Sequence, residues 1–451
     1  MSAGRAHRAV GRAPHLGDDV TVPVTAAILS VGDELLSGDV VNTNLAEVAR
    51  ALRGCGVRVE RALSVPDRRE AIVDALRSCL VDVGMDLCLV TGGLGPTSDD
   101  LTAASVAVAC ALPLAQHPEA EAQITAYLQA RGRPVEAVQL RQAALPAGAE
   151  VIQNPVGSAP GFAVRLAGGE VICMPGVPRE MRAMLAEGVI PRLVARHRLR
   201  PTPRRVYRTL GLREAELAAR VEPIAADARA REALRDLVVH YRVVAPEVFL
   251  TLEAGEGADL AELDAAIVPA LGDALYGIGE ADLPTRLVAA LTAAGLTVAS
   301  AESCTGGRVA ALITGVAGSS SCFHGAVVAY DNAIKTSILG VPASTLAEHG
   351  AVSEATARAM AEGVRAAMAG HADLGVGVTG IAGPSGGSAA KPVGTVDFAV
   401  ADRAGTSHRR LHIHGDRATV QHVAAMWALR LVWDRLVARG LAAAGEADGP
   451  V

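Results

Sequence analysis

Residues 85–100 read MDLCLVTGGLGPTSDD, an apolar run followed by a glycine-rich loop and two carboxylates. The apolar run has the length of a buried β-strand, and its glycines let backbone N–H groups approach an anion where the next helix begins. Short apolar runs alternate with helical periods from residue 25 onward. This alternation predicts parallel β-α-β units and an α/β fold, whose ligands bind beyond the carboxyl ends of the strands.

The alternation stops near residue 195 and resumes near residue 283. Between these points, residues 191–208 (PRLVARHRLRPTPRRVYR) are dense in proline and arginine, as is typical of a domain boundary. We predict five segments, which are a disordered leader (1–24), an α/β domain (25–195), a small α+β module (196–282), a second α/β domain (283–439) and a disordered tail (440–451).

The composition favours work on small molecules. The formal charge of −6 gives no general attraction to nucleic acid or to anionic membranes, and no apolar stretch has the roughly 20 residues of a membrane helix. Seven cysteines without a CxxC pair argue against a disulfide framework and a structural zinc site. We therefore expect a cytoplasmic protein without nucleic-acid or membrane partners.

Two carboxylates, Asp99 and Asp100, end the glycine loop, and a second loop over residues 32–38 adds Asp33 and Glu34. A divalent cation that bridges a pyrophosphate would explain acids beside a phosphate loop. A solvated first helical turn, stabilised by the helix dipole, explains them equally well. The loop has neither the lysine of a Walker motif nor the GxGxxG spacing of a dinucleotide site.

Residues 301–307 read AESCTGG and place three possible nucleophiles side by side. Cys304 is the best nucleophile in principle, but it has no histidine nearby in sequence, so a small buried cysteine is the favoured interpretation. Thr305 suits a helix cap. Ser303 ends the predicted strand, where the N–H groups of residues 305–307 would form an oxyanion site beside its hydroxyl.

Only Lys335 and Lys391 are lysines among the 42 basic residues of the chain. A lysine with a lowered pKa can act as a base, which an arginine cannot do. Lys391 lies in the loop GPSGGSAAKPVG, where a solvated side chain is expected. Lys335 follows Tyr330 by five residues, and the residues alone leave a base for Ser303 and a surface lysine about equally supported.

The segments GDELLSG, NTN, TGGLGPTSDDLT, NPVGSAPG and MPGVPREM together resemble the molybdopterin-binding-like domain of the CinA family, over residues 25–190. The resemblance implies a doubly wound sheet and hydrolysis of ADP-ribose by a divalent metal such as Mg²⁺. It implies that Glu34, Asp99 and Asp100 lie near the metal. It also implies that phosphate lies on the loop residues Gly92, Gly93, Gly95 and Thr97. The alternative is a domain that binds a nucleotide or pterin without catalysis.

The segments AESCTGG, VAGSSSCF, YDNAIK, HGAVSE, GVTGIAGPSGG, KPVGTV and HGDR resemble the C-terminal domain of the same family, over residues 284–435. The resemblance implies an α/β deamidase that converts nicotinamide mononucleotide to nicotinate mononucleotide and ammonia without a metal, in a homodimer. It implies Ser303 as nucleophile and Lys335 as general base, with Tyr330 beside them. The implied substrate contacts are Thr305, Gly306, Thr379, Gly380 and Arg417.

The family's name also suggests a third class, an adaptor for DNA uptake or recombination, in which the basic stretch 191–208 would contact DNA. A charge run at a domain boundary is usually a solvated linker, and the net charge of −6 weighs against DNA binding. The sequence therefore favours an enzyme of pyridine-nucleotide salvage over an adaptor.

Overall fold

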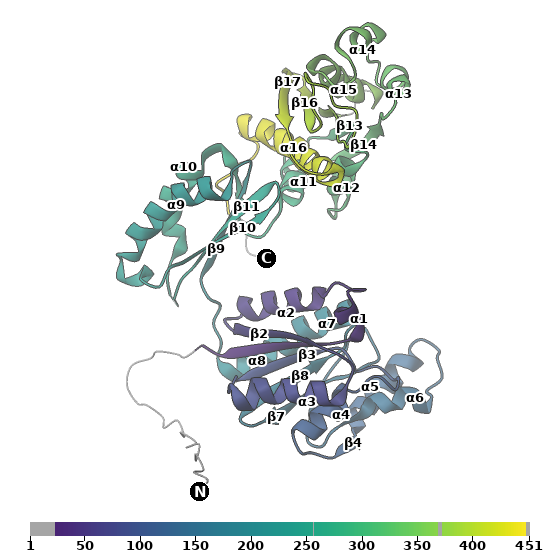
Figure 1. The fold of residues 1–451 in the computed structure, drawn as a ribbon, viewed down its shortest axis with the longest axis vertical. Helices are drawn as coiled ribbons and strands as arrows, with labels where there is room; N and C mark the ends of the chain where they lie inside the picture. The colour runs from purple at the N-terminus through teal and green to yellow at the C-terminus, as the bar shows by residue number, and fades with distance from the viewer. Residues whose placement is uncertain (1–22, 256, 369–371, 448–451) are drawn as a thin grey trace. The chain divides into compact units, whose positions relative to one another are not determined.

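The computed structural model describes residues 23–255, 257–368 and 372–447, and the chain forms two compact units, residues 1–202 and 203–451 (Figure 1). Helix α8 (Ile190–His197) ends the first unit, and strand β9 (Arg204–Leu210) begins the second. Residues 1–22 of the expected leader lie outside the described residues. In the described parts of the chain, no helix combines the length and the hydropathy that crossing a membrane requires.

The first unit is built on a six-stranded sheet with the order β2-β1-β3-β8-β7-β6. Its first four strands are parallel, and its last two are antiparallel to their neighbours. The strands are β1 (Thr25–Val31), β2 (Arg58–Val65), β3 (Leu87–Thr91), β6 (Glu150–Ile152), β7 (Gly161–Leu166) and β8 (Gly169–Met174). A separate antiparallel pair is formed by β4 (Leu114–Gln116) and β5 (Ala144–Pro146).

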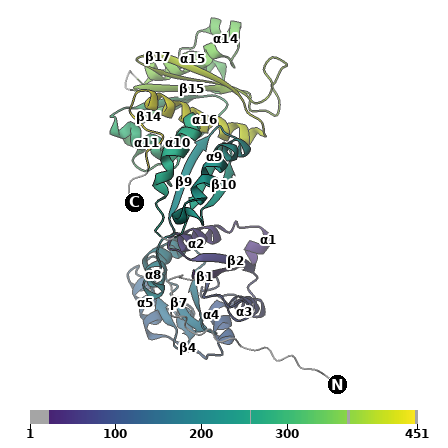
Figure 2. The same ribbon diagram turned by 90° about the vertical axis from the view of Figure 1, so that its left-hand side faces the viewer.

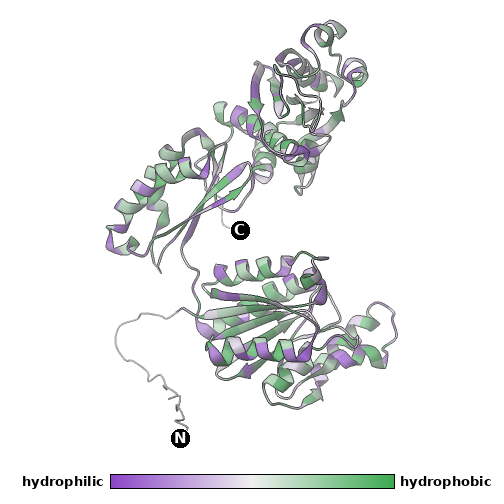
Figure 3. Cartoon of the chain, viewed as in Figure 1, coloured by the Kyte–Doolittle hydropathy of each residue, from purple (hydrophilic) through white to green (hydrophobic). Residues whose placement is uncertain are grey.

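Helices cover both faces of this sheet because successive strand residues point to opposite sides. In β1, Ala27 and Leu29 join one core, while Ala26 and Ile28 join another. The first core packs against α3 (Arg69–Arg77), α4 (Thr102–Ala109) and α5 (Pro118–Gln129), and the second against α2 (Thr43–Gly54), α7 (Pro178–Met184) and α8. The short helices α1 (Asp33–Ser37) and α6 (Ala137–Leu140) lie in connecting loops. Figure 3 shows the apolar strands between helices of mixed polarity, which confirms the predicted α/β layering.

The second unit begins with the expected α+β module. Its antiparallel sheet has the order β10-β11-β9-β12, with helices on one face (Figure 2). These elements are β10 (Val238–Val244), β11 (Glu247–Glu253), β12 (Leu275–Ile278), α9 (Glu214–Arg229) and α10 (Asp264–Leu271). We call residues 203–282 the middle module.

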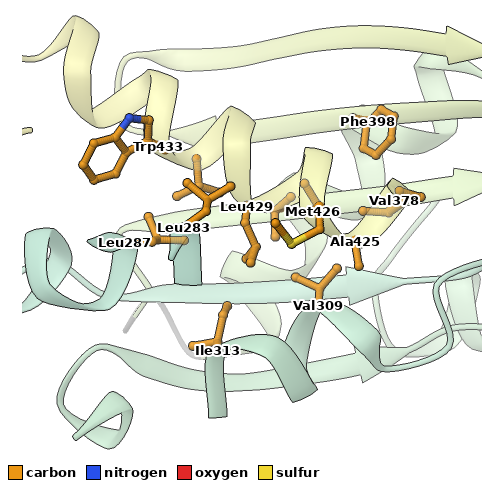
Figure 4. Close-up of a cluster of buried hydrophobic side chains, with 14 of the residues drawn as sticks. Leu283, Leu287, Val309, Ile313, Val378, Phe398, Ala425, Met426, Leu429 and Trp433 are labelled. Carbon is orange, nitrogen blue, oxygen red and sulfur yellow. The ribbon is translucent and has the colours of Figure 1, made fainter. Parts of the chain in front are cut away.

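The remainder of the second unit holds a five-stranded sheet with the order β14-β13-β15-β16-β17. Strands β13 (Val298–Glu302), β14 (Phe323–Val328) and β15 (Leu374–Gly380) are parallel, while β16 (Thr395–Asp402) and β17 (Gly405–His412) continue the sheet antiparallel. One face carries α15 (Glu354–Ala367). The other carries α11 (Leu283–Ala293), α12 (Arg308–Thr314) and α16 (Arg417–Ala438), whose apolar side chains meet in Figure 4. Helices α13 (Asn332–Ser337) and α14 (Ala343–His349) complete it.

The middle module and this second α/β domain share buried contacts. Leu210 and Tyr276 of the middle module belong to the same core as Leu283 and Trp433. Residues 440–447, expected to begin a disordered tail, instead contact the middle module, since Ala447 forms a β-bridge with Ile278. The small residues of this segment carry no signal of that pairing, which arises only when the chain folds back. Residues 448–451 lie outside the described residues.

Candidate functional site

The residues predicted for the C-terminal site gather at one edge of the five-stranded sheet. The parallel strands β13, β14 and β15 end there at Glu302, Val328 and Gly380. Ser303 directly follows β13, and Lys335 lies on α13, the helix that follows β14. This edge is where ligands bind in parallel α/β sheets.

Ser303 is held at the end of β13 by its backbone. Its N–H donates to the carbonyl of Val378 at 2.9 Å, and its own carbonyl accepts the N–H of Gly306 at 3.2 Å. The residue is only 9% exposed. The backbone position of a candidate nucleophile is therefore set by the neighbouring strand.

Glu302 is a residue of the candidate site that the sequence interpretation missed. Its carboxylate is fully buried and accepts four hydrogen bonds of 2.9–3.2 Å, from the N–H groups of Gly307, Val309 and Ala310 and from the hydroxyl of Ser300. A carboxylate at a helix N-terminus is favoured by the free N–H groups and the helix dipole. The signal in the sequence was the position of this carboxylate, five residues before Gly307, which precedes the first residue of α12.

The expected oxyanion site of three amides does not form. The N–H of Gly307 donates to Glu302, and the N–H of Gly306 donates to the Ser303 carbonyl, so both are occupied. Of the three predicted donors, only the N–H of Thr305 makes no hydrogen bond within the described residues. Gly306 and Gly307 adopt φ values of +61° and +94°, so their role is to shape the turn.

The hydroxyl of Thr305 is a second available group. It is buried, and within the described residues it has no hydrogen-bond partner. A buried hydroxyl without a partner costs free energy in a folded protein. Thr305 follows Ser303 by two residues, so its hydroxyl is placed to gain a partner when a ligand enters.

Lys335 is buried, with 1% of its surface exposed. Its Nζ donates to the carbonyls of Ala329 at 2.7 Å and Tyr330 at 3.3 Å, and it forms no ion pair among the described side chains. Burial lowers the pKa of Lys335, while the negative charge of Asp331 raises it. The N–H of Ala329 in turn donates to the Glu302 carbonyl at 2.7 Å, so the amine lies beside the strand end that carries the nucleophile.

The other candidates of this region behave differently. Lys391 stays in its loop, where its Nζ donates to the carbonyl of His349 at 2.9 Å. Cys304 is buried, as the favoured interpretation held, and burial raises its pKa to about 12 although Lys335 and Arg417 act in the opposite direction. The thiol is therefore protonated at neutral pH and is a poor nucleophile.

Four further predicted residues complete the edge. Arg417, at the start of α16, donates to the Tyr330 hydroxyl at 2.6 Å and to the carbonyl of Gly383 at 2.7 Å, and the tyrosine is 60% exposed. Thr379 is buried, and its hydroxyl donates to the carbonyl of Ala351 at 2.7 Å. A Cβ on Gly380 would lie 2.8 Å from the Thr395 carbonyl oxygen. Thr379 and Gly380 therefore shape the edge, and the Arg417–Tyr330 pair faces solvent.

The first unit has a cleft of about 440 Å³ at the carboxyl ends of β1, β3 and β8. It is lined by the predicted residues Glu34, Gly92, Gly93, Gly95, Asp99 and Asp100, and also by Asp67, Gln142, Ser158 and Glu180. The structure therefore brings together most of the residues predicted for the N-terminal site. Thr97 is the exception, since it does not line the cleft.

Asp100 braces the glycine loop. One carboxylate oxygen accepts the N–H of Gly95 at 2.6 Å, and the other accepts the N–H and the hydroxyl of Thr97 at 2.8 and 2.6 Å. The N–H groups of Gly95 and Thr97, which were predicted to bind phosphate, therefore form hydrogen bonds within the loop instead. The carboxylate of the predicted metal ligand Asp100 is likewise occupied by these hydrogen bonds. In a short loop, backbone N–H groups bond to any carboxylate of the loop that can reach them.

Asp67 is an acid of the cleft that the sequence interpretation missed, in the loop after β2. It accepts the N–H of Asp33 at 2.9 Å. Burial raises the pKa of Asp67, and the charges of Asp33, Glu34 and Asp99 raise it further. Carboxylate oxygens suit Mg²⁺. Nevertheless, the described residues contain no group of three or more His, Cys, Asp or Glu side chains placed to hold a metal ion. The cleft therefore carries negative charge that would attract a cation, but its acids do not form a set of metal ligands in the described residues.

Replacing Asp100 with asparagine should loosen the glycine loop. The amide side chain can satisfy fewer of the loop donors, at a cost of about 1–2 kcal/mol, which corresponds to roughly tenfold faster hydrogen exchange. Exchange at the amides of Gly95 and Thr97, followed by mass spectrometry, measures this. Asp99→Asn is the matched control and should leave the rate at Gly95 unchanged, because Asp100 accepts that N–H. Equally faster hydrogen exchange in the two variants would contradict the role of Asp100 in holding the glycine loop.

Two family models match the chain, the probable molybdopterin binding domain over residues 27–195 and the CinA C-terminal domain over residues 280–436. A CinA-like protein from an Anaeromyxobacter species is 44% identical over 91% of this chain and 99% of its own length. One from Citrifermentans bemidjiense is 42% identical over 89% and 95%. A crystal structure of a CinA superfamily protein from Klebsiella pneumoniae is 37% identical, covers 35% of this chain and 96% of its own, and has a TM-score of 0.33. The resemblance found in the sequence is thus confirmed, and the chain belongs to the family of CinA-like proteins.

Proposed function

We propose that the second unit is an amidohydrolase that converts nicotinamide mononucleotide to nicotinate mononucleotide and ammonia. The observation that carries the proposal is the state of Lys335. It is a buried amine that contacts backbone carbonyls, has a lowered pKa and lies beside the end of β13, which Ser303 directly follows. A buried lysine without a counter-ion is costly in a purely structural role. A neutral amine is what a serine nucleophile needs as its base.

The residues suggest the following sequence. Neutral Lys335 accepts the Ser303 proton as the serine oxygen attacks the carboxamide carbon, and the developing oxyanion is met by the free N–H and hydroxyl of Thr305. Lys335 returns the proton to the leaving nitrogen, ammonia departs, and an ester to Ser303 remains. Water, deprotonated by Lys335, hydrolyses that ester to the carboxylate and restores the serine.

The exposed Arg417–Tyr330 pair offers a group for the rest of the substrate. The guanidinium and the phenol hydroxyl lie 2.6 Å apart. Arginine binds phosphate oxygens through paired N–H donors. We assign the pair to the phosphate of the mononucleotide.

Ammonia release from nicotinamide mononucleotide tests the proposal. The wild type and Cys304→Ala should both release ammonia at comparable rates, because the Cys304 thiol is buried and protonated. Product identity is checked by chromatography of nicotinate mononucleotide. A wild type that releases no ammonia would overturn the proposal, and a Cys304→Ala variant that folds but is inactive would move the nucleophile to the cysteine.

The pH profile should report Lys335. Because the neutral amine is the active form, kcat/KM should rise with pH through an apparent pKa that lies below the usual lysine value of roughly 10.4. The charge of Asp331 raises the pKa of Lys335, so Asp331→Asn should shift the rising limb to lower pH. Asparagine can still cap α13 as Asp331 does through Ala333, which limits the structural change. A limb that stays in place or moves to higher pH would contradict Lys335 as the base.

We further propose that the first unit hydrolyses the pyrophosphate of ADP-ribose. The supporting observation is the cleft whose lining includes Gly92 and Gly93 together with the acids Glu34, Asp67 and Asp99. These acids give the cleft negative charge that would attract a divalent cation bound to the pyrophosphate, although within the described residues they form no metal-ligand set by themselves. Glu34→Gln and Asp67→Asn should lower Mg²⁺-dependent release of AMP, whereas Ser303→Ala should not. Binding of ADP-ribose without turnover by the wild type would instead support a binding domain. The homodimer and the cytoplasmic location stay predictions.

A further inference from the structure

The second unit contains a pocket of about 630 Å³ that no step of the proposed reactions uses. Its walls come from the middle module, at Leu210, Gly211 and Leu275, and from β17 and α16. The two tryptophans of the chain, Trp427 and Trp433, both line it. In a protein with 2% aromatic residues, this concentration of indole surface is a distinct feature.

Arg409 supplies a positive charge to the pocket, and this charge acts on the nearby Asp434 carboxylate. Its guanidinium lies over the Trp427 ring, 4.4 Å from the centroid, and within the described residues it forms no hydrogen bond and no ion pair. The neighbouring Arg430 is committed, since it donates to the carbonyls of Asp273 and Ala274 and to Asp434. Within the described residues, the N–H donors of Arg409 are therefore available to a ligand, whereas those of Arg430 are occupied.

The carboxylate of Asp434 is the third polar feature. One of its oxygens accepts the Nε–H of Arg430 at 2.6 Å. The side chain is 39% exposed and lines the pocket, so the other oxygen can accept a donor from a ligand. The pocket thus offers an aromatic wall, a cation and a hydrogen-bond acceptor.

The aromatic wall is held by close packing. Gly211 has a φ of +92°, and a Cβ there would lie 2.8 Å from the Trp427 ring. The middle module therefore closes against the indole without a side chain between them. Trp433 lies almost fully buried beside leucine side chains of the core (Figure 4), and its N–H has no partner within the described residues.

We propose that this pocket binds a mononucleotide, with the base against the Trp427 indole, an exocyclic amino group on Asp434 and the phosphate on Arg409. The volume lies within the range of small-molecule sites. Stacking on tryptophan and arginine–phosphate contacts are the usual means of holding such ligands. The site is separate from the Ser303 edge, because Arg417 precedes Trp427 by ten residues on α16, about 15 Å along the helix.

Intrinsic tryptophan fluorescence tests this directly. Both tryptophans line the pocket, so AMP bound in the first unit, which contains none, is silent. Excitation at the red edge of the indole band avoids adenine absorption. Titration of the full chain with AMP should give a saturable change in emission. Arg409→Gln should weaken the apparent affinity at least about tenfold. Arg403→Gln, a matched change in the turn between β16 and β17, should not.

Further probes separate the parts of the ligand. Adenosine should bind more weakly than AMP, and inorganic phosphate alone should leave the emission unchanged. Trp433→Phe should retain the response, since Trp427 is the stacking residue. The proposal is overturned if AMP gives no change, if phosphate alone gives the full change, or if a folded Arg409→Gln variant binds AMP as the wild type does. None of these outcomes depends on amidohydrolase activity, because the readout is binding and Ser303→Ala can be used throughout.

Discussion

Replacing Ser303 with alanine is expected to lower kcat/KM for ammonia release from nicotinamide mononucleotide by roughly three to six orders of magnitude. The alanine variant cannot form the ester intermediate, and only substrate binding and the Thr305 donors remain. The Ser303 backbone bonds to Val378 and Gly306 are kept, so the fold should be unchanged. Circular dichroism and a stopped ammonia assay measure the two effects. An alanine variant with substantial activity would show that another group attacks the substrate.

Lys335→Met should lower kcat by roughly 10²–10⁴ with a smaller effect on KM, because a general base contributes about that factor to the chemical step. Lys335→Arg should lower kcat as well, since arginine keeps the positive charge but cannot release its proton to act as a base. Lys391→Met is the matched control, as it removes the other lysine of the chain from a loop. Equal losses in Lys335→Met and Lys391→Met would contradict a specific base.

Replacing Glu302 with glutamine should destabilise the second unit by roughly 2–4 kcal/mol. The buried carboxylate accepts the N–H groups of Gly307, Val309 and Ala310 on both oxygens. An amide turns one acceptor into a donor that faces N–H groups, and those buried donors lose their partner. Chemical denaturation followed by tryptophan emission reports this unit, since both tryptophans belong to it.

Glu354→Gln is the control for that measurement. Glu354 also begins a helix, α15, but its side chain is 52% exposed, and within the described residues it pairs with Arg358 and His408 instead of capping backbone N–H groups. Exposed pairs contribute little, so the midpoint should change by no more than about 0.5 kcal/mol. Because the Ser303 turn is built on the same loop, Glu302→Gln should also lower kcat. Similar destabilisation by both variants would contradict a specific contribution of the buried Glu302 carboxylate to the start of α12.

Much of the organisation could be read from local patterns. The glycine loop at residues 92–95 follows a strand and opens into a helical segment, and such loops lie at the carboxyl edge of a parallel sheet. Lys335 is one of only two lysines in the chain, and the structure buries it at the corresponding edge of the second sheet. The periodic spacing of apolar residues predicted the helices and strands, because each of these elements buries one face independently of the rest of the fold.

The state of each polar group could not be predicted in the same way. Gly95 and Gly307 were expected to offer free N–H groups, but carboxylates a few residues away occupy both. Asp67 gave no local sign that it would join the acids of the cleft. Whether a backbone N–H group is free depends on which acceptor lies within hydrogen-bond distance after folding. The sequence of a loop does not specify that distance.

The sequence by itself determined the α/β architecture, because periodic burial depends on residue type and spacing, and its motifs indicated the family. The resemblance to that family then implied Ser303 and Lys335 as the candidate catalytic residues. Only the tertiary structure decided that Glu302 and Asp100 satisfy their own loops, that residues 440–447 return to the middle module, and that Trp427 and Arg409 share a pocket. These outcomes depend on hydrogen bonds and packing in three dimensions. A buried donor is paired by whichever acceptor the folded backbone brings within about 3 Å, wherever that acceptor stands in the chain.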